Sequence, residues 1–158
     1  MNKFKILLVV MVLAAITLPS QTGPEPIISP GVTGAGSGIF PPATTLLGIP
    51  LSGLTFGNGV FLSEDGTAAG QFESTLLGTS VLGQEVEIVV EGEVTQWAAN
   101  GDGSVTMSGA ASIEVGDGAP PSTGVPFSVT VMPDRLSLIL DSITLPAATL
   151  VRGSITIE

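Results

Sequence analysis

The sequence predicts an all-β protein, built as a single antiparallel β-sandwich or as a closed or partly open β-barrel of about eight or nine strands, preceded by an N-terminal signal peptide. Beyond residue 30, apolar and polar side chains alternate with a period of two, as in half-buried strands. Gly, Asn, Asp and Pro separate these runs at short intervals, and no window combines a 3.6-residue apolar period with helix caps. Strands joined this way are antiparallel, and the pattern leaves sandwich and barrel open.

The N-terminus has the features of an export signal. Lys3 and Lys5 precede an apolar run over residues 6–18, which is shorter than the roughly 20 residues that span a bilayer. We expect residues 1–20 to be a signal peptide, with an uncleaved anchor as the alternative. The prediction is a secreted, periplasmic or cell-surface protein without a stable membrane span after cleavage. Residues 21–30, rich in Pro, Ser and Gly, are expected to link this segment to a β domain over 31–158.

The first half of the domain alternates less regularly than the second. In residues 32–40 (VTGAGSGIF) one face carries Gly34, Gly36 and Gly38, which leaves room for a neighbouring strand or a bulky side chain. Turns are expected at 57–59 and at 64–66. Strands of this half are predicted over residues 32–40, 45–56, 59–62 and 68–77.

The clearest strand pair lies in the middle of the chain. Val86, Ile88, Val90 and Val94 share one face of the strand predicted over 85–94. The sequence Asn-Gly-Asp-Gly at 100–103 favours a tight hairpin, because these residues adopt positive φ readily. Further strands are predicted over residues 104–115, 125–132, 135–145 and 153–158.

The composition excludes several functional classes. The chain has no Cys and no His, so it lacks disulfides, thiolate metal sites, a thiol nucleophile and the usual general base. Loss of residues 1–20 would leave two arginines against fourteen Asp and Glu, a balance of −12. Nucleic acid and anionic membrane surfaces need Lys and Arg, and both are disfavoured. We predict a protein that is not an enzyme and uses no cofactor.

A row of glutamates is the most conspicuous polar feature. Glu85, Glu87, Glu91 and Glu93 fall on the strand face opposite the valines, and alternate residues on a strand lie about 6.6–7 Å apart. Carboxylates suit a hard cation such as Ca²⁺, so these four are the candidate metal ligands. A straight row does not converge on one ion, and we favour a solvated face that also discourages edge-to-edge aggregation. Trp97, out of register with the valines, is expected to pack as core rather than to serve as a ligand platform.

Both ends of the domain carry weak motifs. It opens with Val-Thr-Gly-Ala-Gly at 32–36, closes with Gly-Ser-Ile-Thr-Ile at 153–157, and contains a PFSVTV strand at 126–131. In these features it resembles a group of small secreted bacterial all-β domains of unknown function, with a VTGGG-type opening strand and a GGxIxI-type closing strand. The resemblance implies an extracellular or surface β module, often appended to larger secreted proteins, without assigned catalysis.

Three functions follow from these observations. The first is a non-catalytic secreted or cell-surface β module with a structural or interaction role, whose protein or surface partner the sequence does not identify. The second is a small β-barrel that carries an apolar ligand, because 44% of the residues are hydrophobic and about eight strands can enclose one small ligand. The third, the least favoured, is a secreted hydrolase that uses a pair of carboxylates about 5–9.5 Å apart.

Overall fold

A computed structural model describes residues 30–116 and 118–158, and all strands in them belong to one antiparallel system. This confirms the all-β prediction. The predicted signal peptide at 1–20 and nearly all of the linker at 21–30 lie outside the described residues. The strands in chain order are β1 (Gly31–Ile39), β2 (Thr45–Leu46), β3 (Ile49–Leu62), β4 (Thr67–Thr79), β5 (Glu85–Ala99), β6 (Val105–Val115), β7 (Ser122–Met132), β8 (Arg135–Leu140), β9 (Ile143–Thr144) and β10 (Ala148–Ile157).

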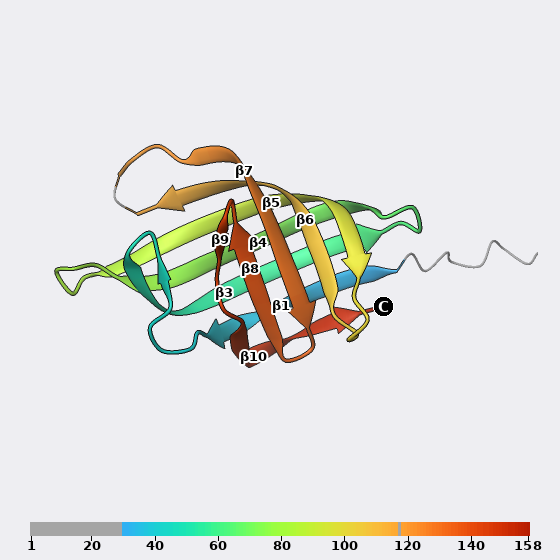
Figure 1. Ribbon diagram of the computed structural model, residues 1–158, viewed down its shortest axis with the longest axis horizontal. Helices are drawn as coiled ribbons and strands as arrows, with labels where there is room; N and C mark the ends of the chain where they lie inside the picture. The colour runs from blue at the N-terminus through green and yellow to red at the C-terminus, as the bar shows by residue number, and fades with distance from the viewer. Residues whose placement is uncertain (1–29, 117) are drawn as a thin grey trace, which may run out of the picture.

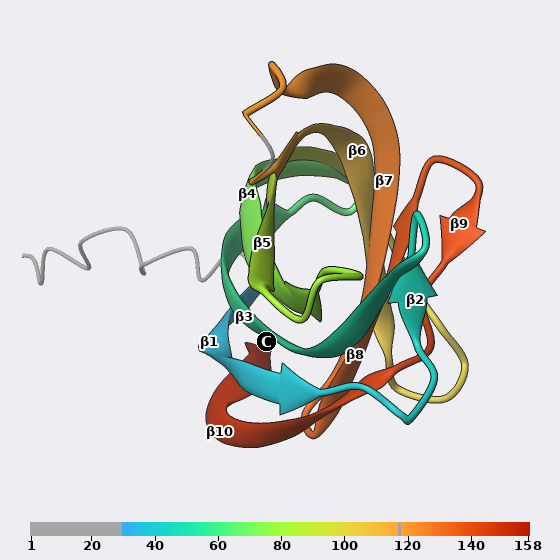
Figure 2. The same ribbon diagram turned by 90° about the vertical axis from the view of Figure 1, so that its left-hand side faces the viewer.

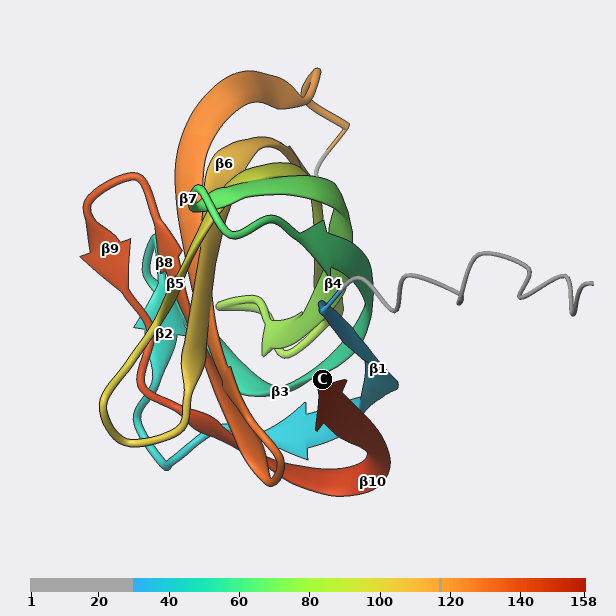
Figure 3. The same ribbon diagram turned by 90° about the vertical axis from the view of Figure 1, so that its right-hand side faces the viewer.

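The sheet curls into a barrel rather than splitting into a sandwich. Its strand order runs β1-β10-β8-β7-β6-β5-β4-β3, and β3 returns to pair with β1. Figures 2 and 3 look at the two ends and show these strands arranged as a ring. The shortest strand pairing in the ring is between β8 and β10, where Leu136 pairs with Ala148 and Arg135 pairs with Thr149. β1 thus joins β3 and β10 by long pairings, whereas β8 and β10 are joined by a short one.

The turn predicted at 57–59 is wrong, because β3 continues through it. Asn58 lies opposite Gly34 on β1 and opposite Phe72 on β4, so the backbone is paired on both sides. The Asn58 amide also donates a 2.9 Å hydrogen bond to the carbonyl of Val32. Pairing on two flanks satisfies the backbone groups that a turn would leave open, and it overrides the local turn preference of Gly-Asn-Gly.

The strand predicted over 135–145 is in fact two strands. The chain reverses at Asp141 and Ser142, and β9 then pairs back along β8. Asp141 has a φ of +53°, a conformation that Asp tolerates better than most residues. The turn at Asp141 and Ser142 contains no Gly, Pro or Asn and lies directly between two apolar runs, which hid the reversal in the sequence.

Large apolar side chains fill the middle of the barrel. Phe72 and Phe127 stack across it with their ring centroids 6.1 Å apart and their planes at 21°. Leu54, Leu76 and Met107 are fully buried beside them. Eight strands give an interior about wide enough for such side chains to occupy. The strands thus enclose a packed core.

One inward position must stay small for this packing to fit. Gly92 on β5 faces the Phe127 ring, and a Cβ atom added there would lie 2.5 Å from Cζ of that ring. The ring has little freedom to move, because it is buried and stacked on Phe72. The shape of the core therefore requires glycine at position 92.

Figure 1 shows the connections between the strands, and those at the two ends of the barrel differ in polarity. We call the end that carries the connections 40–48, 80–84, 116–121 and 141–142 the apolar end. The polar end carries 63–66, 100–104 and 133–134. Gly31 also lies at the polar end, where its carbonyl accepts a hydrogen bond from the N–H of Glu158. The described chain thus starts and finishes away from the apolar end.

We expect Gly92→Ala to lower the free energy of unfolding by about 1–3 kcal/mol, because the added methyl overpacks the core against Phe127. Chemical denaturation measures the change. Gly57→Ala is the matched control, since a Cβ there meets no atom within 4 Å. Equal effects of the two substitutions would contradict the packing described for Gly92.

Candidate functional site

Apolar side chains are exposed on the loops of the apolar end. Leu47 is 69% exposed in the β2–β3 turn, and Val81 and Leu82 are 97% and 82% exposed at the tip of the β4–β5 hairpin. The hairpin tip projects beyond the rest of the barrel in Figure 1. The corresponding turns of the polar end are instead built from Asn, Asp, Glu, Ser, Gly and Pro. Exposed apolar residues grouped at one end are typical of a binding surface.

An apolar pocket of about 200 Å³ opens at this end. Leu46 and Leu140 form part of its wall and are almost completely buried, whereas Leu47 stands exposed at its edge. Two polar residues, Ser122 and Asp141, complete the wall. The lining comes from the β2–β3 turn, the end of β6, the start of β7 and the β8–β9 turn, and consists of Leu46, Leu47, Ile113, Val115, Ser122, Val125, Leu140, Asp141 and Ile143.

This pocket lies at the mouth of the barrel and not in its middle. The fully buried side chains of the centre, such as Phe72, Leu54 and Met107, do not line it. A ligand held as in a hollow barrel would need the space that these side chains occupy. The open space for an apolar molecule is therefore at one end of the barrel, where the strands end.

The backbone at Leu47 is unusual. Leu46 pairs with Ile49, so Leu47 and Gly48 alone form the loop between β2 and β3. Their φ values are +51° and +81°, a combination typical of type I′ turns. Asn, Asp or Gly normally occupy the first of these positions, and a left-handed leucine costs about 1–2 kcal/mol. Local structure does not account for a leucine that is both strained and exposed.

The polar end is closed by hydrogen bonds. Trp97 packs partly buried against the core, and its Nε1–H donates a 2.7 Å hydrogen bond to the carbonyl of Ser63. A bulge between Val94 and Gln96 shifts the register of β5, which places Trp97 opposite the buried Met107. This confirms the prediction of a core role for Trp97 and explains why it is out of register with the valines.

Two aspartates stabilise the turns of this end. Asp102 accepts hydrogen bonds from the hydroxyl and the N–H of Ser104, at 2.7 and 3.0 Å. Asp65 accepts equivalent bonds from Thr67. These bonds favour the charged carboxylates and hold the pKa of each aspartate below the ordinary value of 3.8. Both residues therefore have a structural task as turn formers.

The glutamate row lies on the outer face of β5. Glu85, Glu87, Glu91 and Glu93 are all exposed, and Glu91 lies directly opposite Glu73 of β4. Within residues 30–116 and 118–158, no group of three or more Asp or Glu is arranged to hold a metal ion. Glu73 is the carboxylate that the sequence did not associate with the row, because the pairing of β4 with β5 brings it there. The geometry is that of a solvated acidic face.

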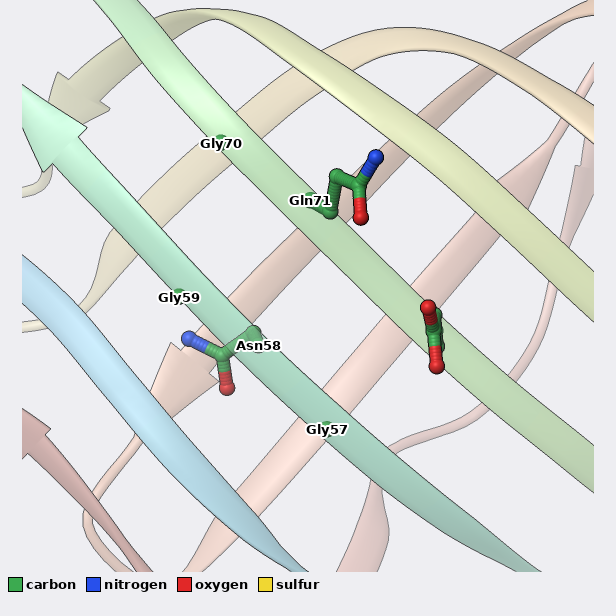
Figure 4. A pocket seen from close by; sticks show the side chains of 6 residues that line it. Gly57, Asn58, Gly59, Gly70 and Gln71 are labelled. Atoms are coloured by element: carbon green, nitrogen blue, oxygen red, sulfur yellow. The ribbon is translucent and has the colours of Figure 1, made fainter.

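A shallow hollow of about 390 Å³ lies beside this face, over β3 and β4 (Figure 4). Its lining includes Gly57, Gly59 and Glu73. A Cβ at Gly57 or Gly59 would meet nothing within 4 Å, so the hollow has no side-chain walls there. Asn58 also lines it, and its side chain reaches from β3 toward β1. The hollow offers little enclosure to a ligand, and the apolar pocket is the better candidate site.

We expect Glu73→Gln to raise the melting temperature slightly at low salt, because like charges directly opposite on a sheet destabilise it by about 0.5 kcal/mol. The gain should shrink as salt screens the pair. Glu87→Gln is the control, since Glu87 lies opposite Leu77. A stabilisation of the unmodified protein by Ca²⁺, absent at the same ionic strength of Na⁺ and lost in Glu73→Gln, would instead indicate a metal site.

We expect Asp102→Asn to lower the melting temperature near neutral pH and to lose this effect in acid. A carboxylate whose pKa is depressed by folding stabilises the protein above its unfolded pKa, and the contribution is lost as the pH falls through the folded pKa. The difference should therefore begin to fall near the ordinary pKa of 3.8 and vanish only as the pH passes below the lowered pKa of Asp102 in the folded protein. Glu87→Gln removes an equal charge and serves as the control. A difference that persists at low pH would contradict the role of the carboxylate charge.

None of the described residues forms a helix of the length and apolar character needed to cross a membrane. Comparisons with protein-family models, with curated proteins and with solved structures found no match to this chain. The resemblance to small secreted β domains thus stays a prediction, and the site has to be interpreted from its own geometry.

Proposed function

We propose that this protein is a non-catalytic β-barrel module, secreted or held at the cell surface, that binds a small apolar ligand at the apolar end of the barrel. The observation that carries the proposal is the pocket of about 200 Å³ with the exposed Leu47 at its edge. An apolar pocket with a few polar groups in its wall is the usual form of a small-molecule site.

The backbone of the β2–β3 turn supports the proposal. An Asn at position 47 would expose less apolar surface to water than Leu does, and it would adopt the positive φ more readily. A leucine held there against local preference is expected where the side chain contacts something outside the turn, since strained residues concentrate at functional sites. The tip of the β4–β5 hairpin, with the exposed Val81 and Leu82, lies at the same end of the barrel.

The placement of the chain ends also supports it. Gly31 and Glu158 are joined by a hydrogen bond at the polar end. A tether attached through either end of the domain would leave the apolar end free. The catalytic alternative has less support, because the chain has no His or Cys, and turn hydrogen bonds hold Asp65 and Asp102 in their charged form.

A neutral apolar dye tests the proposal. We expect Nile red to gain fluorescence with the folded protein and to saturate at one site. Leu47→Asn should weaken dye binding at least fivefold while the melting temperature stays the same or rises, because Asn-Gly is the preferred pair for this turn. The readout is a fluorescence titration together with a thermal melt.

Phe61→Ser is the matched control. Phe61 is 67% exposed, close to the 69% of Leu47, but it lies at the end of β3 near the polar end. Equal loss of dye binding in both variants would mean non-specific adsorption and would contradict the proposal. A fall in melting temperature for Leu47→Asn would show that the leucine serves the fold itself.

A further inference from the structure

We infer that the ligand of the apolar pocket carries a hydrogen-bond-donating head group, a hydroxyl or an ammonium, that meets Asp141, and that it is not a carboxylate such as a fatty acid. The inference rests on the proposed function and names the chemistry of the same site. It follows from the size of the pocket, the charge of its wall and the way the β8–β9 turn holds Asp141.

The size of the pocket limits the apolar part of the ligand. A cavity of about 150 Å³ holds a benzene molecule, so the pocket of about 200 Å³ takes about eight carbon atoms at most. Most of the side chains that line it are aliphatic: Leu46 and Leu140 are buried in the wall, and Leu47 is exposed at its edge. A short alkyl chain or a small ring fits this space.

The wall of the pocket contains a carboxylate and, among the described residues that line it, no Lys or Arg. Asp141 is its only ionisable group among the described residues that line it. Arg135 and Arg152 do not line it. The Nε atom of Arg135 lies 3.4 Å from Oδ1 of Asp134 at the polar end. A ligand carboxylate would be repelled by Asp141 and would find no partner, whereas an ammonium or hydroxyl can donate to the carboxylate.

The turn holds Asp141 at the pocket. Its N–H donates a 2.7 Å hydrogen bond to the carbonyl of Pro126, which ties the β8–β9 turn to β7. One carboxylate oxygen accepts from the hydroxyl of Ser142 at 3.3 Å, which leaves acceptor capacity for a ligand. Asp and Asn both tolerate the positive φ of this position, so the turn can keep its shape when the charge is removed.

The test uses three compounds with the same alkyl chain: hexylammonium, 1-hexanol and hexanoate. Binding is followed by amide chemical shifts of the ¹⁵N-labelled protein at physiological salt, which screens general attraction to an acidic surface. We expect hexylammonium and 1-hexanol to shift residues that line the pocket, and hexylammonium to bind at least tenfold more tightly than hexanoate.

Asp141→Asn should reduce this preference for hexylammonium to less than threefold and leave the melting temperature nearly unchanged. Glu91→Gln removes one charge from the outer face of β5 and should keep the preference. The inference is overturned if hexanoate binds as tightly as hexylammonium, if the two variants behave alike, or if no compound shifts the pocket residues. If Nile red still binds at Leu47 in that case, the proposed function stands and only the head-group assignment fails.

Discussion

The structure depends on filling the fixed interior of a ring of strands. Eight strands enclose a space that side chains can just occupy, and here Phe72 and Phe127 stack across it. Gly92 faces the Phe127 ring, and because glycine has no Cβ atom, the ring can occupy the space that a methyl group would fill. Because the chain has no disulfides, this packing and the ladder hydrogen bonds that close the ring have to stabilise the fold.

A filled interior determines where the protein can bind a ligand. Among the described residues, the apolar pocket opens where strands end and their connections cover the core incompletely. At the polar end, Trp97 and the hydrogen-bonded loops at 63–66 and 100–104 close the barrel. At the other end, aliphatic side chains reach the surface around an open pocket, and a single carboxylate lies in its wall. The difference between the two ends thus follows from the residues of their turns.

The sequence predicted part of this site's surroundings but not the site. The alternation identified the core-facing valines of β5 and the glutamates opposite them, since both patterns depend only on neighbours in the chain. It missed Leu47, because a Leu-Gly pair resembles the start of a strand more than a type I′ turn. It also assigned a turn to 57–59, where pairing with both β1 and β4 keeps the strand extended.

The all-β class, the inward and outward faces of most strands and the hairpin at 100–103 could be predicted from the amino-acid pattern, because each is encoded within a few adjacent residues. The choice between barrel and sandwich could not be predicted in this way. That choice depends on β1, which pairs with both β3 and β10 although β10 lies more than a hundred residues further along the chain. The pocket has the same origin: its residues come from four separate connections and strand ends, and they meet only because the closed ring brings those ends to one rim.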